Sequence, residues 1–182
     1  MASKDTIIIS PVGDVPTWVS SIIMVGLTPV FGFKTEVLVL LDDIEFAYNA
    51  DRDQYHSTVI LQELEKRAPA HCVKILAVTK EDLFIPILTH VYGEAQLGGV
   101  ASIISVFRLV EDAIADPVGK GRDRIIKEAA HELGHTFDLR HCDDSSCIMH
   151  YCRKLEDVDH KTDRFCRYCT VLFNDSINLL EG

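Results

Sequence analysis

The chain has 182 residues, of which 47% are hydrophobic and 25% are charged, a balance typical of a globular protein. Its length fits a single domain. The 28 acidic and 18 basic residues give a net charge of −10, which disfavours binding to the phosphate backbone of nucleic acids. The sequence lacks the run of about eighteen apolar residues that would predict a membrane-spanning helix. We therefore expect neither nucleic acid nor a membrane as a partner.

The expected cellular compartment determines whether the cysteines are thiols or disulfides. The apolar segment Ile22–Thr28 is short, and neither a basic region nor a cleavage site marks it as a signal peptide, so we expect a cytoplasmic protein. In that reducing compartment the six cysteines are expected to be thiols or metal ligands. Five of them, and five of the eight histidines, follow residue 130. The functional site is therefore expected in the last third of the chain.

The first half of the chain alternates between strand-like and helix-like segments. Strands are predicted at Thr6–Ser10, Val37–Leu41 and Val73–Val78, and helices at about Pro16–Phe31 and Asp51–Arg67. The unbroken apolar character of the second strand favours burial of both its faces. This alternation predicts a mostly parallel sheet with helical crossovers.

The pattern then changes to a strand pair and two helices. Strands are predicted at Thr89–Gly93 and Ala101–Leu109, and the short link between them, Glu94–Gly99, favours antiparallel pairing. A long helix is predicted from about Asp123 and a last helix from about Thr162. The fold class is therefore α/β (α+β): one domain over residues 1–182, with a twisted mixed sheet flanked by helices.

Residues 131–135 read His-Glu-Leu-Gly-His, the HExxH motif. Positions four residues apart share one face of a helix, so the imidazoles of His131 and His135 can bind one zinc ion. Glu132 lies beside them, where it can act as general base in metal-assisted hydrolysis of a peptide bond. The alternative is a helix that merely carries these residues on its polar face, since so short a motif also occurs by chance.

A third histidine, His141, follows six residues after His135. HExxHxxxxxH is the spacing of the metzincins, in which the third histidine returns to the same metal and the fourth zinc position stays open. Asp138 stands where the metzincin pattern has glycine, which there adopts a positive φ angle. Aspartate tolerates that conformation at some cost, so the position of His141 depends on the backbone of Asp138.

The segment Cys147-Ile148-Met149-His150-Tyr151 resembles the Met-turn of metzincins. The resemblance implies that Met149 packs beneath the zinc-binding histidines. It also implies that Tyr151 is a candidate to ligate the zinc or to stabilise the transition state. The alternative for Met149 is simple filling of the core.

The cysteine spacing resembles that of one branch, the archaemetzincins. Cys142 directly follows His141, Cys147 comes next, and Cys166 and Cys169 form a CxxC pair. The resemblance implies a zincin-like domain with an active-site helix in an N-terminal subdomain, about residues 1–141. A C-terminal subdomain, about residues 142–182, would hold the Met-turn and a structural zinc bound by the four cysteines.

The chemistry of these residues agrees with the resemblance. Four thiolates in a reducing compartment suit a closed tetrahedral zinc site, so we expect two zinc ions per chain, one catalytic and one structural. Two disulfides are the alternative. Cys72 and Cys152 are left over and are expected to be free thiols, while His150 and His160 fit no ligand position.

The leading hypothesis for function is a zinc-dependent peptidase, either an endopeptidase or an aminopeptidase of limited specificity. With zinc polarising the scissile carbonyl, Glu132 would accept a proton from water and return it to the leaving amine. An extended peptide would bind along the antiparallel edge strand, which makes Glu94 and Gln96 candidates to face the cleft. The basic run Lys120–Lys127 is expected to be a solvated helix face.

Two other classes of protein remain possible from the sequence. The first is a non-proteolytic zinc-binding module, in which Asp138 misplaces His141 and leaves the catalytic site poorly occupied or blocked. The second is a zinc-ribbon protein that binds nucleic acid, which conflicts with the net charge of −10.

Overall fold

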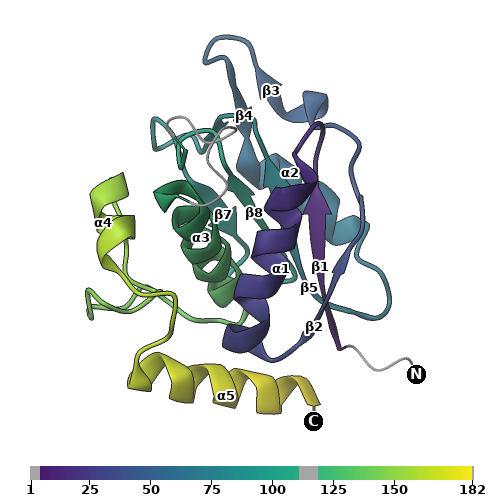
Figure 1. Cartoon of the computed structure of the whole chain (residues 1–182). Helices are drawn as coiled ribbons and strands as arrows, with labels where there is room; N and C mark the ends of the chain where they lie inside the picture. The colour runs from purple at the N-terminus through teal and green to yellow at the C-terminus, as the bar shows by residue number, and fades with distance from the viewer. Residues whose placement is uncertain (1–4, 111–118, 182) are drawn as a thin grey trace.

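The computed structural model describes residues 5–110 and 119–181, and its centre is a five-stranded sheet in the order β2-β1-β5-β8-β7 (Figure 1). The strands are β1 (Thr6–Pro11), β2 (Lys34–Val37), β5 (Cys72–Thr79), β7 (Gly93–Ala95) and β8 (Ala101–Ser105). All neighbouring pairs are parallel except β7 and β8, so β7 is an antiparallel strand at one edge. This arrangement confirms the predicted α/β class with a mostly parallel mixed sheet.

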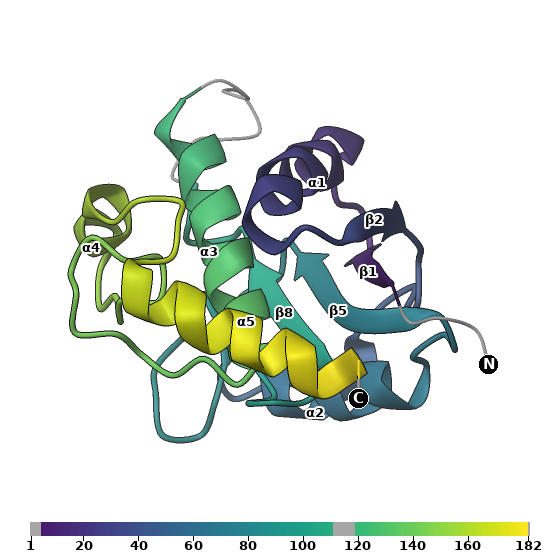
Figure 2. The same cartoon turned by 90° about the horizontal axis from the view of Figure 1, so that it is seen from below.

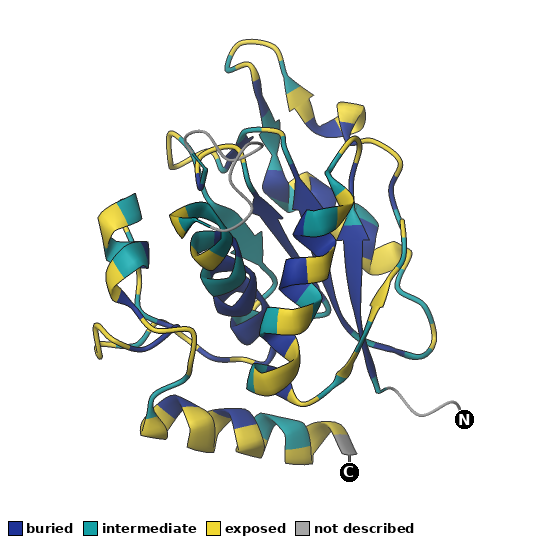
Figure 3. Ribbon diagram, viewed as in Figure 1, coloured by how far each residue is buried: buried dark blue, intermediate teal, exposed yellow. Residues whose placement is uncertain are grey.

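Helices cover both faces of the sheet (Figure 2). Helices α1 (Thr17–Phe31) and α3 (Lys120–Thr136) lie on one face, and α2 (Ser57–Lys66) lies on the other. Strand β1 contributes to the hydrophobic cores on both faces of the sheet, because side chains alternate along a strand. Ile7 and Ile9 pack against α1 and α3 (the α1–α3 cluster), and Ile8 packs in the core on the side of α2 (the α2 cluster). Figure 3 shows this pattern as buried inner faces and exposed outer helix faces.

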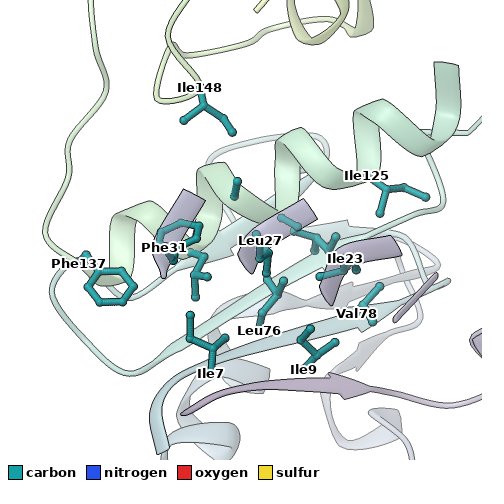
Figure 4. Packing of buried hydrophobic residues seen from close by; sticks show 14 of the residues in the cluster. Ile7, Ile9, Ile23, Leu27, Phe31, Leu76, Val78, Ile125, Phe137 and Ile148 are labelled. Atoms are coloured by element: carbon teal, nitrogen blue, oxygen red, sulfur yellow. The ribbon is translucent and has the colours of Figure 1, made fainter. Parts of the chain in front are cut away.

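The larger of the two cores joins the C-terminal helix to the rest of the fold. Phe31 at the end of α1 stacks on Phe137 at the end of α3, with ring centroids 5.6 Å apart (Figure 4). Phe173 of α5 (Arg167–Glu181) packs edge-on against Phe137, at 5.0 Å. Burying a phenylalanine contributes roughly 1.5–3 kcal/mol, so these rings fix α5 near the C-terminal end of α3.

Several small elements complete the fold. A second sheet has the order β3-β4-β6, formed by β3 (Tyr48–Asn49), β4 (Gln54–His56) and β6 (Leu83–Phe84). A single 3-10 turn, η1 (Glu45–Ala47), precedes it, and the short helix α4 (Leu155–His160) precedes α5. The sequence did not predict this sheet or α4. Within residues 5–110 and 119–181, no helix has the length and apolar character needed to cross a membrane.

The predicted strand at Val37–Leu41 is wrong. The strand β2 spans Lys34–Val37, lies at the sheet edge and is largely exposed. The apolar run after it belongs to a loop, in which Leu41 is buried and Leu38 and Leu40 are half-buried in the α2 cluster. A loop that contributes to the core has the same continuous apolar pattern as a buried strand, and the sequence alone did not separate the two.

Other predicted elements exist but begin or end elsewhere. The helix predicted from Asp51 begins only at Ser57, because residues 54–56 pair in the small sheet as β4. The edge strand predicted at Thr89–Gly93 begins at Gly93, so part of the presumed link is the strand itself. Strand β8 ends at Ser105 rather than Leu109, and the last helix begins at Arg167 rather than near Thr162. The strands β1 and β5 and the helices α1 and α3 agree with prediction within a few residues.

The expectation of a solvated basic face at Lys120–Lys127 is wrong for two of its cations. Arg124 makes two hydrogen bonds to the carboxylate of Asp159, of 2.7 and 2.8 Å. Lys127 Nζ donates to the carbonyl oxygens of Val158 and Asp159, at 3.2 and 3.1 Å. These contacts hold α4 against α3.

Candidate metal centres and active-site cleft

Three histidines converge at the C-terminal end of α3. His131 and His135 lie one turn apart with their Nε2 atoms at 3.2 Å, and the ring of His141 lies 5.4 and 4.9 Å from theirs. One ligand nitrogen from each of the three lies within 4.8 Å of the others. Two nitrogens bound to one tetrahedral zinc at about 2.0–2.1 Å are about 3.3 Å apart. The spacing of the histidines therefore fits a zinc ion.

The two helical histidines are oriented by carbonyl groups. His131 Nδ1 donates to the carbonyl of Ile148 at 2.8 Å, and His135 Nδ1 donates to that of Leu139 at 2.6 Å. With Nδ1 protonated, the Nε2 atom of each ring keeps its lone pair available to bind a metal. Burial lowers the pKa of His131 well below its ordinary value and that of His135 to about 4. Both rings are therefore neutral at pH 7, the form that binds metal.

Asp138 makes the turn that returns His141 to this site. Its φ angle is 64°, in the left-handed region, so it adopts the conformation that glycine has in the metzincin pattern. Its N–H donates to the carbonyl of His135 at 3.0 Å, and the N–H of Gly98 donates to the same oxygen at 2.9 Å. The turn forms despite the aspartate, and the geometric reason for a displaced His141 does not hold.

Met149 lies under the active-site helix. It is fully buried, and a Cβ added to Gly134 would come within 2.5 Å of its sulfur, so the glycine gives it room. This position fills the core beneath α3, and the Met-turn role of Met149 stays a prediction. Tyr151 is 45% exposed, and its ring lies 4.9 Å from that of His141.

Glu132 points into the space between α3 and the edge strand. Its side chain is nearly buried, and a Cβ added to Gly93 of β7 would come within 2.6 Å of Glu132 Cγ. Burial, followed by the neighbouring Glu128 carboxylate, raises the pKa of Glu132 well above its ordinary value, while Lys161 opposes the rise. Gly93 therefore leaves the room that Glu132 occupies beside the histidines.

Sequence reasoning missed a buried ion pair next to Glu132. Lys161 is 1% exposed, and its Nζ lies 3.7 Å from Oε2 of Glu128. Glu128 precedes Glu132 by four residues, which places both on one face of α3, so helix periodicity could have identified it. Lys161 follows α4 in a polar segment, and no spacing signal connects it to the motif.

Four cysteines form a second cluster. One sulfur from each of Cys142, Cys147, Cys166 and Cys169 lies within 4.8 Å of the others. The sulfurs of Cys142 and Cys166 are 3.8 Å apart, which matches two ligands of a tetrahedral zinc with bonds of about 2.3 Å. A disulfide needs about 2.05 Å, and none of the six cysteines, all of them among the described residues, forms one in this structure.

The cysteine cluster is tied to the histidine cluster through the backbone. Cys142 N–H donates to the carbonyl of Met149 at 3.0 Å, and His150 Nδ1 donates to the carbonyl of Cys142 at 2.9 Å. His150 therefore supports this segment, whereas His160 is exposed and bonds within α4. Cys72 is buried away from both clusters, and Cys152 is half-buried.

A cleft of about 690 Å³ opens over the histidines. Its walls come from residues 85–97, which include β7, from α3, and from residues 140–161. The outer edge of β7 has no partner strand among the described residues, so its backbone groups border the cleft. Glu94 lines the cleft as expected, whereas Gln96 is not among the lining residues and its amide donates to Glu65 at 2.9 Å.

Comparison with known proteins identifies the family. Residues 35–175 match the family model described as peptidase family M54. The chain belongs to this family. It is 41% identical to the archaemetzincin of Archaeoglobus fulgidus over 140 residues, 75% of this chain and 81% of that protein. It is 36% identical to that of Methanocaldococcus jannaschii over 171 residues, 93% of each.

Solved structures agree with the M54 assignment. The archaemetzincin of Methanopyrus kandleri superposes with a TM-score of 0.83 at 31% identity, covering 96% of this chain and 97% of that one. A zinc-dependent peptidase from Methanocorpusculum labreanum gives a TM-score of 0.81 at 31% identity, covering 92% and 100%. The chain is thus a member of a zinc metallopeptidase family, with the fold of the archaemetzincins, and carries groups of histidines and cysteines that could hold metal.

Proposed function

We propose that this M54 family member is a zinc-dependent peptidase in which Glu132 is the general base. The observation that carries the proposal is the position of Glu132 beside the three histidines, on the wall of a cleft bordered by an unpaired edge strand. A peptidase needs a proton acceptor next to the metal and a surface that holds the substrate extended, and this cleft offers both.

The proposed metal content is two zinc ions per chain. His131, His135 and His141 would hold the catalytic ion with one position left open, and the four clustered cysteines would hold the structural one. A zinc ion at the histidines supplies Lewis-acid polarisation of the scissile carbonyl and makes water more acidic. The proposed subdomains meet between His141 and Cys142, so the structural site would begin where the catalytic one ends.

The side chains of the cleft have separate roles in this scheme. Glu132 accepts a proton from the attacking water and delivers it to the leaving amine nitrogen. Tyr151, whose ring lies 4.9 Å from that of His141, would donate a hydrogen bond to the negatively charged oxygen that forms in the transition state. The free edge of β7 binds the substrate backbone as an added strand. Met149 supports the histidines from below.

We propose an endopeptidase or aminopeptidase of limited specificity that acts in the cytoplasm. A site of four clustered cysteine thiolates, as proposed for the structural zinc, is compatible with a reducing compartment. The non-proteolytic alternative was motivated by Asp138, and the positive φ angle of that residue removes its motivation.

The test combines zinc content with cleavage of a peptide library. Native mass spectrometry of protein purified without chelator is expected to find two zinc ions, and one after His131→Ala. Glu132→Gln should retain both ions while cleavage, followed by mass spectrometry of the products, falls at least about a hundredfold. The matched control is Glu65→Gln, outside the cleft, which should cleave normally. Undiminished cleavage by Glu132→Gln would disprove the mechanism.

A further inference from the structure

The acidic side chains of the cleft are already engaged or buried. The carboxylate of Glu94 accepts hydrogen bonds from the hydroxyls of Ser57 and Thr58, the latter at 2.8 Å, at the start of α2. Glu128 pairs with Lys161 and is 5% exposed, and Glu132 is 6% exposed. A substrate entering the cleft therefore meets little free negative charge from these three residues.

Two arginines provide the exposed charge of the cleft. Arg140 and Arg153 both line it, both are exposed, and neither forms an ion pair with another residue in ranges 5–110 and 119–181. Other arginines of this region bind carboxylates through two hydrogen bonds each: Arg108 binds Asp82 and Arg124 binds Asp159. Arg140 and Arg153 differ in that both are exposed residues of the cleft lining and neither has such a carboxylate partner among the described residues.

Both arginines are close in sequence to residues of the proposed catalytic site. Arg140 directly precedes His141, and Arg153 follows Tyr151 by two residues. The rings of His141 and Tyr151 lie 4.9 Å apart, so the two arginines belong to segments that meet at the metal site. The remaining exposed lining includes the apolar Leu88 and Leu97.

The two exposed arginines of the cleft contrast with the negative net charge of the whole chain. A net charge of −10 repels anionic peptides from most of the surface. A guanidinium binds a carboxylate through two parallel hydrogen bonds, which adds orientation as well as affinity. Exposed positive charge in the cleft would attract a carboxylate to the site.

We propose that Arg140 and Arg153 are specificity determinants that select peptides with a carboxylate group close to the scissile bond. The carboxylate comes from an aspartate or glutamate side chain or from a free C-terminus, and apolar residues occupy the rest of the cleft. This inference rests on the proposed function only in taking the cleft as the peptide-binding site.

The test measures binding, so that it does not depend on turnover. The protein is the zinc-loaded Glu132→Gln variant, and the probes are four dansylated heptapeptides of alanine and leucine. They combine a central glutamate or glutamine with a C-terminal carboxylate or amide, and Kd is measured by fluorescence. The fully neutral peptide is expected to bind about tenfold more weakly than the best carboxylate peptide, and the preference should shrink at high salt. The two singly charged peptides show which carboxylate the site recognises.

Substitution of the arginines assigns the preference. Arg140→Gln and Arg153→Gln are expected to weaken binding of the carboxylate peptides, and the double variant should bind all four peptides alike. Arg164→Gln removes the same charge from an exposed position outside the cleft, and it should keep the full preference. Zinc content, measured on each variant, is expected to stay unchanged.

Several outcomes would overturn the inference. These are equal Kd values for all four peptides in the parent protein, no binding at millimolar concentration, a preference that survives in the double variant, or an equal loss in Arg164→Gln. Cleavage of the peptide library by the unsubstituted protein is scored separately. Cleavage without a carboxylate preference overturns this inference alone, whereas a carboxylate preference without cleavage overturns the proposed function alone.

Discussion

Gly93 controls the space around Glu132. The β7 backbone passes so close to α3 that a Cβ at this position would come within 2.6 Å of Glu132 Cγ and 2.7 Å of the Ile103 carbonyl oxygen. The Glu132 side chain would have to move, and β7 would have to shift away from the Ile103 carbonyl of β8. The glycine is therefore a positioning residue for the proposed base.

The substitution Gly93→Ala tests this role. A displacement of about 1 Å at a catalytic group costs roughly a hundredfold in rate, so we expect kcat to fall by about that factor. Zinc content should be unchanged, because the three histidines are not displaced. Ala95→Gly on the same strand is the control, since it perturbs β7 without adding an atom beside Glu132. Normal kcat in Gly93→Ala would refute the steric argument.

Lys161 balances two buried carboxylates. Its substitution by methionine leaves Glu128 and Glu132 without this cation, which we expect to destabilise the protein by about 3 kcal/mol. Glu128→Gln in the same chain removes one of the two carboxylates, so the double variant should be destabilised by less than the sum of the single changes. Denaturant titrations at saturating zinc measure each value. Strictly additive effects would show that the two side chains do not interact.

The sequence indicated the position of some residues of the site but not of others. The histidines, Cys142 and Cys147 are set by short spacings within α3 and the segment that follows it, and Asp138 adopts the conformation that this spacing requires. Cys166 and Cys169 form a CxxC pair at the start of α5, so their spacing too was visible in the sequence. Gly93 and Lys161 reach Glu132 from a distant strand and from the segment after α4. Their roles follow from the packing of separate elements, which no local pattern encodes.

At the scale of elements, α4 shows how the cleft is built. This six-residue helix is too short to be stable alone, so its contacts with α3 must hold it. Arg124 and Lys127 both contact its C-terminal end, where cations also interact favourably with the helix dipole. Arg153 and Lys161, on either side of α4, line the cleft. The charge pattern of residues 120–127 did not distinguish cations facing water from cations holding a second helix.

Asp159→Asn tests the docking of α4. Arg124 holds the pKa of Asp159 below its ordinary value. The native state thus binds fewer protons than the unfolded state, and the stabilisation is complete above the unfolded pKa of about 3.9 and lost as pH falls through the folded pKa. We expect the variant to be about 1–2 kcal/mol less stable at pH 7, with the difference shrinking as pH falls below the unfolded pKa of about 3.9.

Hydrogen exchange and a control substitution separate the loss of α4 docking from the general effect of removing one negative charge. Hydrogen exchange is expected to accelerate in residues 155–161 of Asp159→Asn while the central sheet keeps its protection. Asp163→Asn is the matched control, because Asp163 is 62% exposed and lies 3.8 Å from Arg164, in a surface pair worth little. A stability difference that persists unchanged at pH 3 would contradict the assignment to the Arg124–Asp159 pair.

At the scale of the whole molecule, the fold has two parts. The central sheet supports α1, α2 and α3, and the C-terminal segment after residue 141 forms one wall of the cleft. The parallel order of the central sheet was predictable, because its inner strands β1 and β5 are long and apolar. The small sheet was not, because strands of two or three residues leave no periodicity to detect. The C-terminal segment adds Ile148, Met149, Val158 and Phe173 to the buried apolar residues, a smaller share of its length than in the rest of the chain, so we expect a further source of order in it.

The proposed structural zinc supplies that order, and its removal should show where it acts. Metal binding at such a site contributes to folding directly, so complete chelation is expected to lower Tm by about 10 °C or more. Burial raises the pKa of the Cys147 and Cys169 thiols in the metal-free protein, so these two cysteines become neutral once the metal is removed. Hydrogen exchange should accelerate in residues 142–169, while β1, β5 and β8 stay protected.

His131→Ala is the control for this experiment, because it empties only the proposed catalytic site. Its Tm should fall less than that of the fully chelated protein, and residues 142–169 should stay protected. His141 is exposed whereas Cys147 and Cys169 are buried, so mild chelation should produce the same state as His131→Ala before the cysteine cluster loses its metal. Uniform loss of protection across the sheet would instead mean that the zinc supports the whole domain, and the proposed division after residue 141 would be wrong.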